Sequence, residues 1–356
     1  MKRSTEYILT THTGSLPRPP ELLDALQCRD RGEGDGERLD EQVRAAVADV
    51  VRRQADAGVS VVNDGEASKI GYATYVKERL DGFGGEAGMA GLLADMAEFP
   101  DYMRRVVSGV DFAMPACVGP VSYRGLNAVR ADIANLQAAL DGADVEDAFL
   151  SAASPGVIAV FLQNQHYPSH EEYVFALADA MKVEYDEIHR AGIVLQLDCP
   201  DLAMSGHMLS ESLDDFRARA RVNVEAIAHA TRDIPPDAMR MHLCWGNYEG
   251  PHHHDVALRV GVQVGDAARV EADLAAMGVD ASTGLLQAPS VGFPPAGSEP
   301  EAVATGKLGR DLPVAESHGP HLLPQGTLFC LRAASLSRAP STRARPLRPS
   351  RGAWPT

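Results

Sequence analysis

His242 and Cys244 are the residues whose types and spacing point most directly to chemistry. They lie two positions apart in the run MHLCWGNY at 241–248. On a strand, side chains two positions apart project from the same face, and an imidazole and a thiolate on one face supply half of a tetrahedral zinc site. Zinc also keeps a bound sulfur deprotonated and reactive near neutral pH. The pair equally fits a buried strand cysteine beside a hydrogen-bonded histidine, so both interpretations are open.

The composition narrows the class of protein. The 356 residues are 45% hydrophobic and 23% charged, as in a globular protein. A net charge of −16 argues against a nucleic-acid-binding surface, which needs a basic footprint. We find neither a signal peptide nor an apolar run long enough for a membrane span. Five scattered cysteines fit a reducing compartment, so we expect a cytoplasmic protein that binds neither nucleic acid nor membrane.

Short β-rich runs alternate with longer amphipathic runs over the first 250 residues. We expect strands at 7–11, 59–63, 115–118, 157–162, 193–197 and 239–244, and helices at 39–57, 71–80, 127–140, 171–191 and 213–230. This alternation is typical of βα units and a parallel sheet. Polar and glycine-rich residues follow the strands, which is where a (β/α)8 barrel keeps its active site. The expected fold class is therefore α/β, a (β/α)8 TIM-type barrel rather than a doubly wound sheet, because no glycine-rich phosphate loop follows a strand.

The pattern does not continue through the C-terminal hundred residues. We predict a barrel core at 1–256 and a divergent region at 257–356, in which the last one or two βα units are divergent or incomplete. From about residue 317, arginines accumulate among Ser, Pro and Ala, and no acidic residue follows Glu316. Such a segment buries too little apolar surface to offset the entropy of ordering it, so we expect a poorly ordered tail.

Four polar clusters follow predicted strands and would converge on one rim of a barrel. They lie at 13–15, 64–66, 198–200 and 242–244. Backbone amides around Gly14 and Ser15 suit the carboxylate of a small substrate. Glu66 and Asp198 suit its ammonium group, and the fourth cluster suits a metal ion.

Six motifs, in this order, resemble the catalytic barrel of cobalamin-independent methionine synthase, and most closely the short single-barrel branch of that family. They read THTGSLPRP, DGEASKIGYATYVKERLDGF, GPVSYRG, ASPGVIAVFLQNQHYPS, VLQLDCPDLA and MHLCWGNYEGPHHHD, within about residues 5–256. The resemblance implies a methyltransferase that carries out zinc-dependent alkyl transfer to a thiol, converting homocysteine to methionine. It also implies a methyl donor, either a folate or a methyl-corrinoid protein.

The resemblance assigns roles to the clusters residue by residue. His242 and Cys244 would be ligands of Zn2+. Glu66 and Asp198 are the expected catalytic residues: Glu66, together with Ser15 and the neighbouring Gly14, would contact the amino-acid part of a homocysteine-like thiol, and Asp198 would hold its ammonium group. One further pocket candidate, His166, follows the fourth predicted strand, and it fits a surface-loop histidine equally well.

The chain departs from the family beyond Asp255. The family completes its zinc site with a glutamate after the seventh strand and a cysteine after the eighth. Neither motif is found, and Cys330 lacks the expected Gly-Thr-Asp-Cys-Gly context. Three interpretations are open: a frameshift-like loss of the last two strands that impairs catalysis, replacement of a ligand by Cys199, or return of Cys330 or a histidine of 252–254 to the metal. We favour the first, because zinc normally takes three or four protein ligands and Cys199 fits a small buried residue.

Several functions therefore compete. Within the superfamily, the alternative is a transferase that opens an epoxide with a thiol such as coenzyme M, although Glu66 and Asp198 favour a substrate with an ammonium group. A decarboxylase of the related uroporphyrinogen type needs no metal, but it leaves His242 and Cys244 unexplained. A non-enzymatic family member would bind a small amino acid or a protein partner without turnover.

Overall fold

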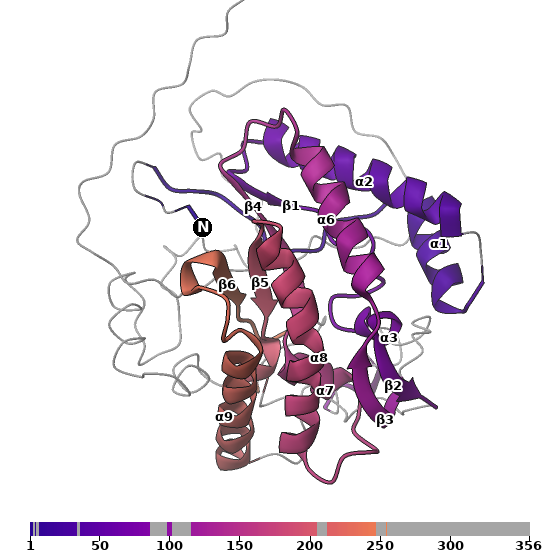
Figure 1. Cartoon of the computed structure of the whole chain (residues 1–356), viewed down its shortest axis with the longest axis vertical. Coiled ribbons are helices and arrows are strands. Elements are labelled where there is room, and N and C mark those ends of the chain that lie inside the picture. The colour runs from indigo at the N-terminus through magenta and orange to yellow at the C-terminus, as the bar shows by residue number, and fades with distance from the viewer. Residues whose placement is uncertain are drawn as a thin grey trace, which may run out of the picture.

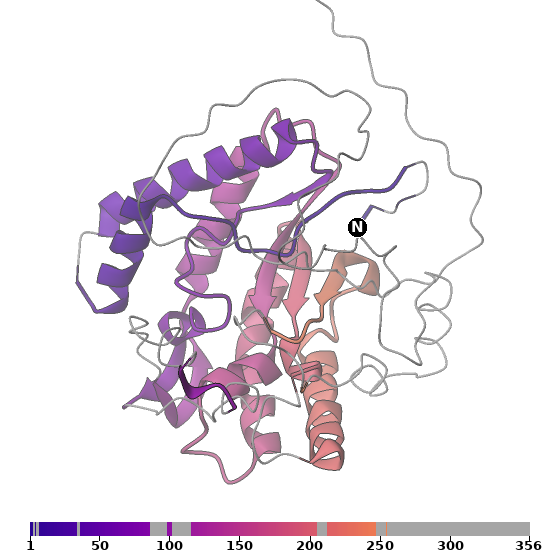
Figure 2. The same cartoon turned by 180° about the vertical axis from the view of Figure 1, so that it is seen from behind.

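The structure is a computed structural model and is an α/β fold (Figures 1 and 2). It describes residues 1–2, 4, 7–33, 36–85, 98–101, 115–204, 212–246 and 254. The C-terminal region predicted for 257–356 lies outside these residues. Among the residues described, no helix has the length and apolar character needed to cross a membrane.

A parallel sheet forms the centre of the fold, as the sequence predicts. Its strands, in spatial order, are β1 (Val61–Asn63), β4 (Asp147–Ala153), β5 (Val194–Asp198) and β6 (Met239–His242). The predicted strand at 7–11 contributes only one parallel bridge, from Thr11 to Val61 at the outer edge of β1. The described part of the chain thus supplies four strands to this sheet, and closure into an eight-stranded barrel stays a prediction.

The sheet is strongly curved. In a flat sheet, Thr11 and β6 would stand four strand spacings apart, about 19 Å, which is farther than an arginine side chain extends. Arg240 on β6 nevertheless donates hydrogen bonds from Nη1 to Thr11 Oγ1 and from Nη2 to the carbonyl oxygen of His12, both 3.1 Å. The two edges therefore bend toward each other, and alternate side chains of each strand converge on the concave face.

The helices are α1 (Pro20–Asp30), α2 (Gly36–Asp56), α3 (Val76–Arg79), α6 (Leu126–Leu140), α7 (Pro155–Phe161), α8 (His170–Arg190) and α9 (Leu213–Ala230), with short 3-10 turns η1 (Pro200–Leu202) and η2 (Pro236–Ala238). Helices α6 and α8 lie in front of the strands in Figure 1 and behind them in Figure 2, so they cover one side of the sheet. The predicted helices at 39–57, 127–140, 171–191 and 213–230 are confirmed. The helix predicted at 71–80 reduces to turns followed by α3, and α1 is an additional helix.

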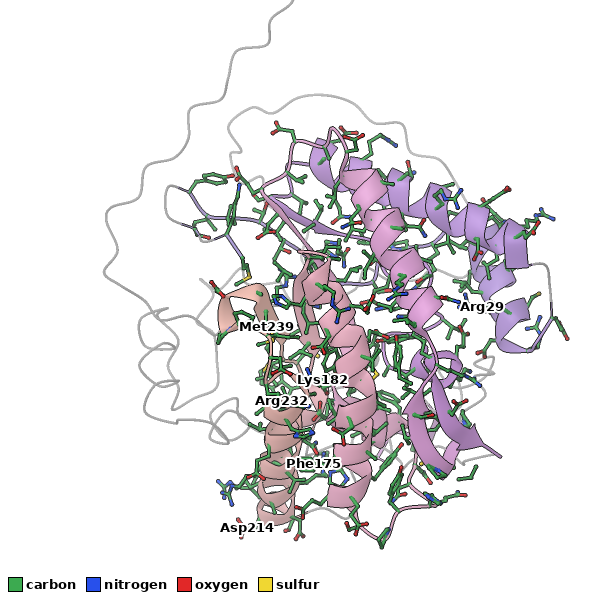
Figure 3. All side chains as sticks on the ribbon, viewed as in Figure 1. Arg29, Phe175, Lys182, Asp214, Arg232 and Met239 are labelled. Carbon is green, nitrogen blue, oxygen red and sulfur yellow. The ribbon has the colours of Figure 1, made fainter. Side chains whose placement is uncertain are left out.

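Capping residues place the ends of the long helices. Ser169 accepts a hydrogen bond from the amide of Glu172 at the start of α8, and Ser212 does the same from Asp215 at the start of α9. Gly192, with φ of 77°, ends α8. Helices α8 and α9 then pack side by side (Figures 1 and 3).

The strand predicted at 157–162 is wrong, because these residues form α7. Ser154 caps this helix by accepting a hydrogen bond from the amide of Val157, and Pro155 occupies its first turn. The apolar run is too short for its hydrophobic pattern to separate a helix from a strand. The strand of this region is β4, whose segment DAFLSAA contains three alanines, a residue depleted in strands.

The strand predicted at 115–118 belongs to a different sheet. It is part of β3 (Ala116–Tyr123), which pairs antiparallel with β2 (Leu80–Gly84). Gly82, with φ of 94°, permits the close approach, since a Cβ there would lie 2.7 Å from the carbonyl oxygen of Pro120. The motif GPVSYRG therefore runs along β3 and just past it instead of following a strand of the parallel sheet.

A buried ionic cluster connects this two-stranded sheet to the helices. Arg79 pairs through Nη2 with Asp132 and donates from Nη1 to Glu184 Oε2 at 3.0 Å. The hydroxyl groups of Tyr75 and Tyr123 donate to the same carboxylate at 2.6 and 2.7 Å. Burial alone would raise the pKa of Glu184, but the Arg79 charge and these hydrogen bonds outweigh it and hold that pKa below its usual value.

Candidate functional site

Side chains on the concave face of the sheet form an apolar cluster and two cross-strand rows. Val61, Phe149 and Val194 make an apolar floor. The strand register then places Ser151, Gln196 and Arg240 in one row, and Ala153, Asp198 and His242 in the next. The last row lies at the carboxyl ends of the strands, where the polar clusters at 13–15 and 64–66 also arrive, so the predicted convergence of these clusters is present.

Glu66 is held in an unusual conformation within this convergence. Its φ is 55°, which residues other than glycine rarely adopt, and its side chain is buried. The amide of Glu66 donates to Asp64 Oδ1 at 2.9 Å, and Oε1 lies against Gly14. The other carboxylate oxygen, Oε2, is buried without a hydrogen-bond partner among the described residues. Since an unpartnered buried oxygen is costly, Glu66 is ready to accept a hydrogen bond from a ligand.

Asp198 is the second buried carboxylate of the site. It accepts a hydrogen bond from Gln196 Nε2 at 2.8 Å. Burial, and next the negative charge of Glu66, raise the pKa of Asp198 well above its usual value. A cationic group bound between Asp198 and Glu66 would relieve this repulsion, so the pair is suited to an ammonium ion.

His242 ends β6 beside Asp198 and offers an unused nitrogen. Its Nδ1 is buried and has no hydrogen-bond partner among the described residues. Burial, and next the charge of Arg240, lower the pKa of His242 to about 4. The imidazole is therefore neutral near neutral pH, which is the form that binds metal ions.

Cys244 follows β6, which is two residues shorter than the predicted strand. It is half-buried and not part of a disulfide. His242 and Cys244 supply nitrogen and sulfur, the donor atoms that zinc prefers. Within the described residues, no group of three or more His, Cys, Asp or Glu is placed to hold a metal ion. The donor chemistry of these two residues thus fits zinc, and both stay candidate ligands.

Cys199 is a small buried residue instead of a clear third ligand. It is fully buried, its Sγ donates to the carbonyl oxygen of Leu197 at 3.6 Å, and burial raises the pKa of its thiol. A thiol held in the neutral form is a poor ligand. Of the other candidates, His254 pairs with Glu98 at 2.6 Å, and Cys330 lies outside the described residues, as do 252–253.

Two predicted substrate contacts lie farther from the buried row. Ser15 is exposed at the surface, next to the buried Gly14. His166 is also exposed, in the loop after α7 and not directly after a strand. Its amide donates to Asn164 Oδ1 at 3.1 Å, and its ring packs edge-on against Tyr167. These contacts fit the surface-loop interpretation of His166.

Four further side chains of the site escaped the sequence interpretation. They are Ser151, Gln196, Arg240 and Lys69, whose Nζ donates to the carbonyl oxygen of Ser151. A usable signal exists for Gln196 and Arg240, since each stands two residues before a predicted site residue and so shares its face. Lys69 lies three residues after Glu66 in the same motif.

Gly14→Ala tests how closely the N-terminal loop packs on Glu66. The added Cβ would overlap Glu66 Oε1 and lie 3.1 Å from Ser151 Oγ. We expect the free energy of unfolding to fall by about 1–3 kcal/mol, the usual cost of overpacking, measured by urea denaturation. Gly36→Ala is the matched control, because a Cβ there meets nothing within 4 Å. Equal unfolding midpoints for the two variants would contradict this packing.

Comparisons with known proteins agree with the motifs. Residues 8–98 match the family model described as the catalytic domain of cobalamin-independent synthase. The chain is 24% identical over 253 residues to methionine synthase of Sulfolobus acidocaldarius, which covers 70% of this chain and 65% of that protein. It is 26% identical over 254 residues to methionine synthase of Saccharolobus solfataricus, and this alignment covers 69% of this chain and 66% of that protein. The match thus spans just under two thirds of the length of these relatives.

A solved structure of a B12-independent methionine synthase from Shewanella sp. W3-18-1, in complex with selenomethionine, aligns with a TM-score of 0.48 and 19% identity. The alignment covers 68% of this chain and 63% of that one. The sequence matches, together with the six motifs, support membership of the cobalamin-independent methionine synthase family.

Proposed function

We propose that this chain is a methyltransferase that transfers a methyl group to the thiol of homocysteine and so forms methionine, in the cytoplasm. The observation that carries the proposal is the buried pair Glu66 and Asp198 beside the unpartnered nitrogen of His242. It combines a receptor for an ammonium group with a metal-binding nitrogen. The relatives named methionine synthase support this reaction class.

The two carboxylates bind the amino-acid end of the substrate in this proposal. Asp198 and Glu66 accept hydrogen bonds from the ammonium group, whose charge offsets the repulsion between them. The loop of Gly14 and Ser15 faces the substrate carboxylate. With the amino-acid end of the substrate fixed, its thiol extends toward His242. Binding of the ammonium and carboxylate groups therefore orients the reacting sulfur.

His242 and Cys244 hold zinc in this proposal. Bound zinc lowers the pKa of the substrate thiol and keeps the sulfur as a thiolate. Neutral His242 is already in its ligand form. We expect the donor to be a methylated folate, and we infer that the curved sheet is one wall of a (β/α)8 barrel.

The test is methyl transfer from methyltetrahydrofolate triglutamate to homocysteine by the full chain, with and without added zinc. We expect methionine only in the presence of zinc, and about one zinc per chain after dialysis, as in other single-metal sites. Neither bound zinc nor methionine after zinc addition would contradict the proposal. That result would favour a catalytically impaired family member, for which the present support is the lack of a three-ligand group among the described residues.

A further inference from the structure

Arg240 lies at the centre of the concave face and is fixed from several directions. Its side chain is buried, with the guanidinium carbon 3.5 Å from the ring centroid of Phe149. It donates to Gln196 Oε1 at 2.7 Å, and to Thr11 and His12 across the sheet. A guanidinium stacked on a ring and bonded to separate acceptors has little freedom, so it orients the groups to which it donates.

Gln196 is oriented by this contact. An arginine only donates, so the amide oxygen of Gln196 must face Arg240 and the NH2 group must point away from it. On that side lie Asp198 Oδ1 at 2.8 Å, Ser151 Oγ at 3.1 Å and the carbonyl oxygen of Thr13. Gln196 is fully buried, so an amide oxygen left without a donor is costly there. Without Arg240, the amide can rotate and turn its oxygen toward the Asp198 carboxylate.

The same two side chains hold the N-terminal loop. Arg240 binds the backbone at His12, and Gln196 binds it at Thr13, immediately before Gly14. The N-terminal loop, which lies against Glu66, is therefore attached to the buried pair Arg240 and Gln196, and so is the Asp198 carboxylate. The spacing between this loop and the Asp198 carboxylate depends on that pair.

We propose that Arg240 is a positioning residue that sets the preference for a thiol carrying an amino group. Through Gln196 it fixes the Asp198 carboxylate, and through His12 it fixes the loop that carries Gly14. The inference rests on the proposed function, since it assigns the ammonium group of homocysteine to Asp198. Arg240 does not touch the substrate, so its effect is on the preference for the ammonium group and not on the affinity for thiols in general.

The test compares two thiols by calorimetric binding to the zinc-loaded full chain. They are homocysteine and 4-mercaptobutanoate, which is homocysteine without its amino group. The ratio of their dissociation constants reports the amino-group preference. We expect Arg240→Met to lower this preference by about tenfold, the usual size of one hydrogen bond to a charged group. Arg240→Lys keeps one donor for Gln196 and is expected to recover part of the preference.

A double variant separates positioning from general damage. Asp198→Asn removes the charge that Arg240 is proposed to orient. In the Asp198→Asn background, Arg240→Met is therefore expected to change the preference by less than about twofold. If Arg240→Met fails to fold, Gln196→Met removes the same donor to Asp198 and is expected to give the same loss.

Arg79→Lys is the control for altering a buried arginine, because Arg79 lies in the separate ionic cluster with Glu184. It is expected to lower stability and leave the preference within about twofold. An unchanged preference in folded Arg240→Met, or an equal loss of affinity for both thiols, overturns the inference. So does a wild-type chain with no preference. A chain that prefers homocysteine but forms no methionine refutes the proposed function and leaves the inference standing.

Discussion

If the proposed zinc site exists, Cys244→Ala is expected to lower the zinc content from about one ion per chain to near zero, and to lower methyl transfer by at least about 100-fold. Removing a residue that only supports a metal ligand typically lowers metal affinity or activity by about 10–100-fold. Removing a ligand itself is therefore expected to cost at least the upper end of that range. Cys244 is one of the two zinc ligands proposed among the described residues, and the remaining imidazole of His242 is not expected to hold zinc by itself. Elemental analysis after dialysis measures the first effect and methionine formation the second.

The matched control for this substitution is Cys28→Ala. Cys28 lies on α1, is half-buried and receives a hydrogen bond from Arg31 at 3.4 Å. The change removes the same sulfur atom far from β6, so zinc content and turnover are expected to stay at the wild-type level. Full zinc content in Cys244→Ala would show that the metal site lies elsewhere. Loss of zinc in Cys199→Ala would identify that buried thiol as a further ligand.

Arg79→Met is expected to lower the free energy of unfolding by about 3–5 kcal/mol, because removing one partner of a buried ion pair leaves uncompensated charge. Glu184 and Asp132 would keep their carboxylates in a buried environment without the guanidinium. This loss is a large share of the roughly 5–15 kcal/mol that stabilises a typical domain. Urea denaturation at neutral pH measures it.

Arg124→Met provides the comparison with an exposed ion pair. Arg124 binds Asp81 at 3.1 Å, and both side chains are about half exposed. Exposed pairs contribute about 0–1 kcal/mol, so the unfolding midpoint should move little. Similar losses in Arg79→Met and Arg124→Met would mean that the cluster around Glu184 adds no stability beyond that of a solvated pair.

The parts of the fold with strong local signals were predictable from the sequence. The long helices carry an amphipathic pattern and serine caps, and α9 matches its predicted bounds of 213–230. The run at 157–162 lacked such a pattern, because all of its own residues are apolar. Its helix is favoured by the cap at Ser154 and by Pro155 in the first turn. Antiparallel pairing of β2 with β3 depends on contacts distant in sequence, which alternation of elements does not reveal.

Some residues of the candidate site could likewise be predicted from the sequence, and others could not. Glu66, Asp198 and His242 could be predicted because each lies within, or no more than three residues after, the end of a predicted strand, and the structure brings them to one edge of the sheet. His166 was placed after a predicted strand that is in fact α7, and it is exposed, so its place in the pocket stays a prediction. Arg240 and Gln196 lay on the correct face of predicted strands, but a charged or amide side chain at such a position gains meaning only when its partners across the sheet are known.

The bond between Arg240 and Thr11 has a consequence for how the protein is made. It joins residues 229 positions apart in sequence, and the neighbouring bond to His12 spans 228. Contacts of such long range form late, because the loop between them must be closed first. On the ribosome, the N-terminal loop emerges early, but its bonds to Arg240 cannot form until β6 has been synthesised. The pocket is therefore completed only near the end of folding, and a nascent chain ending before residue 240 carries its carboxylates without a finished binding site.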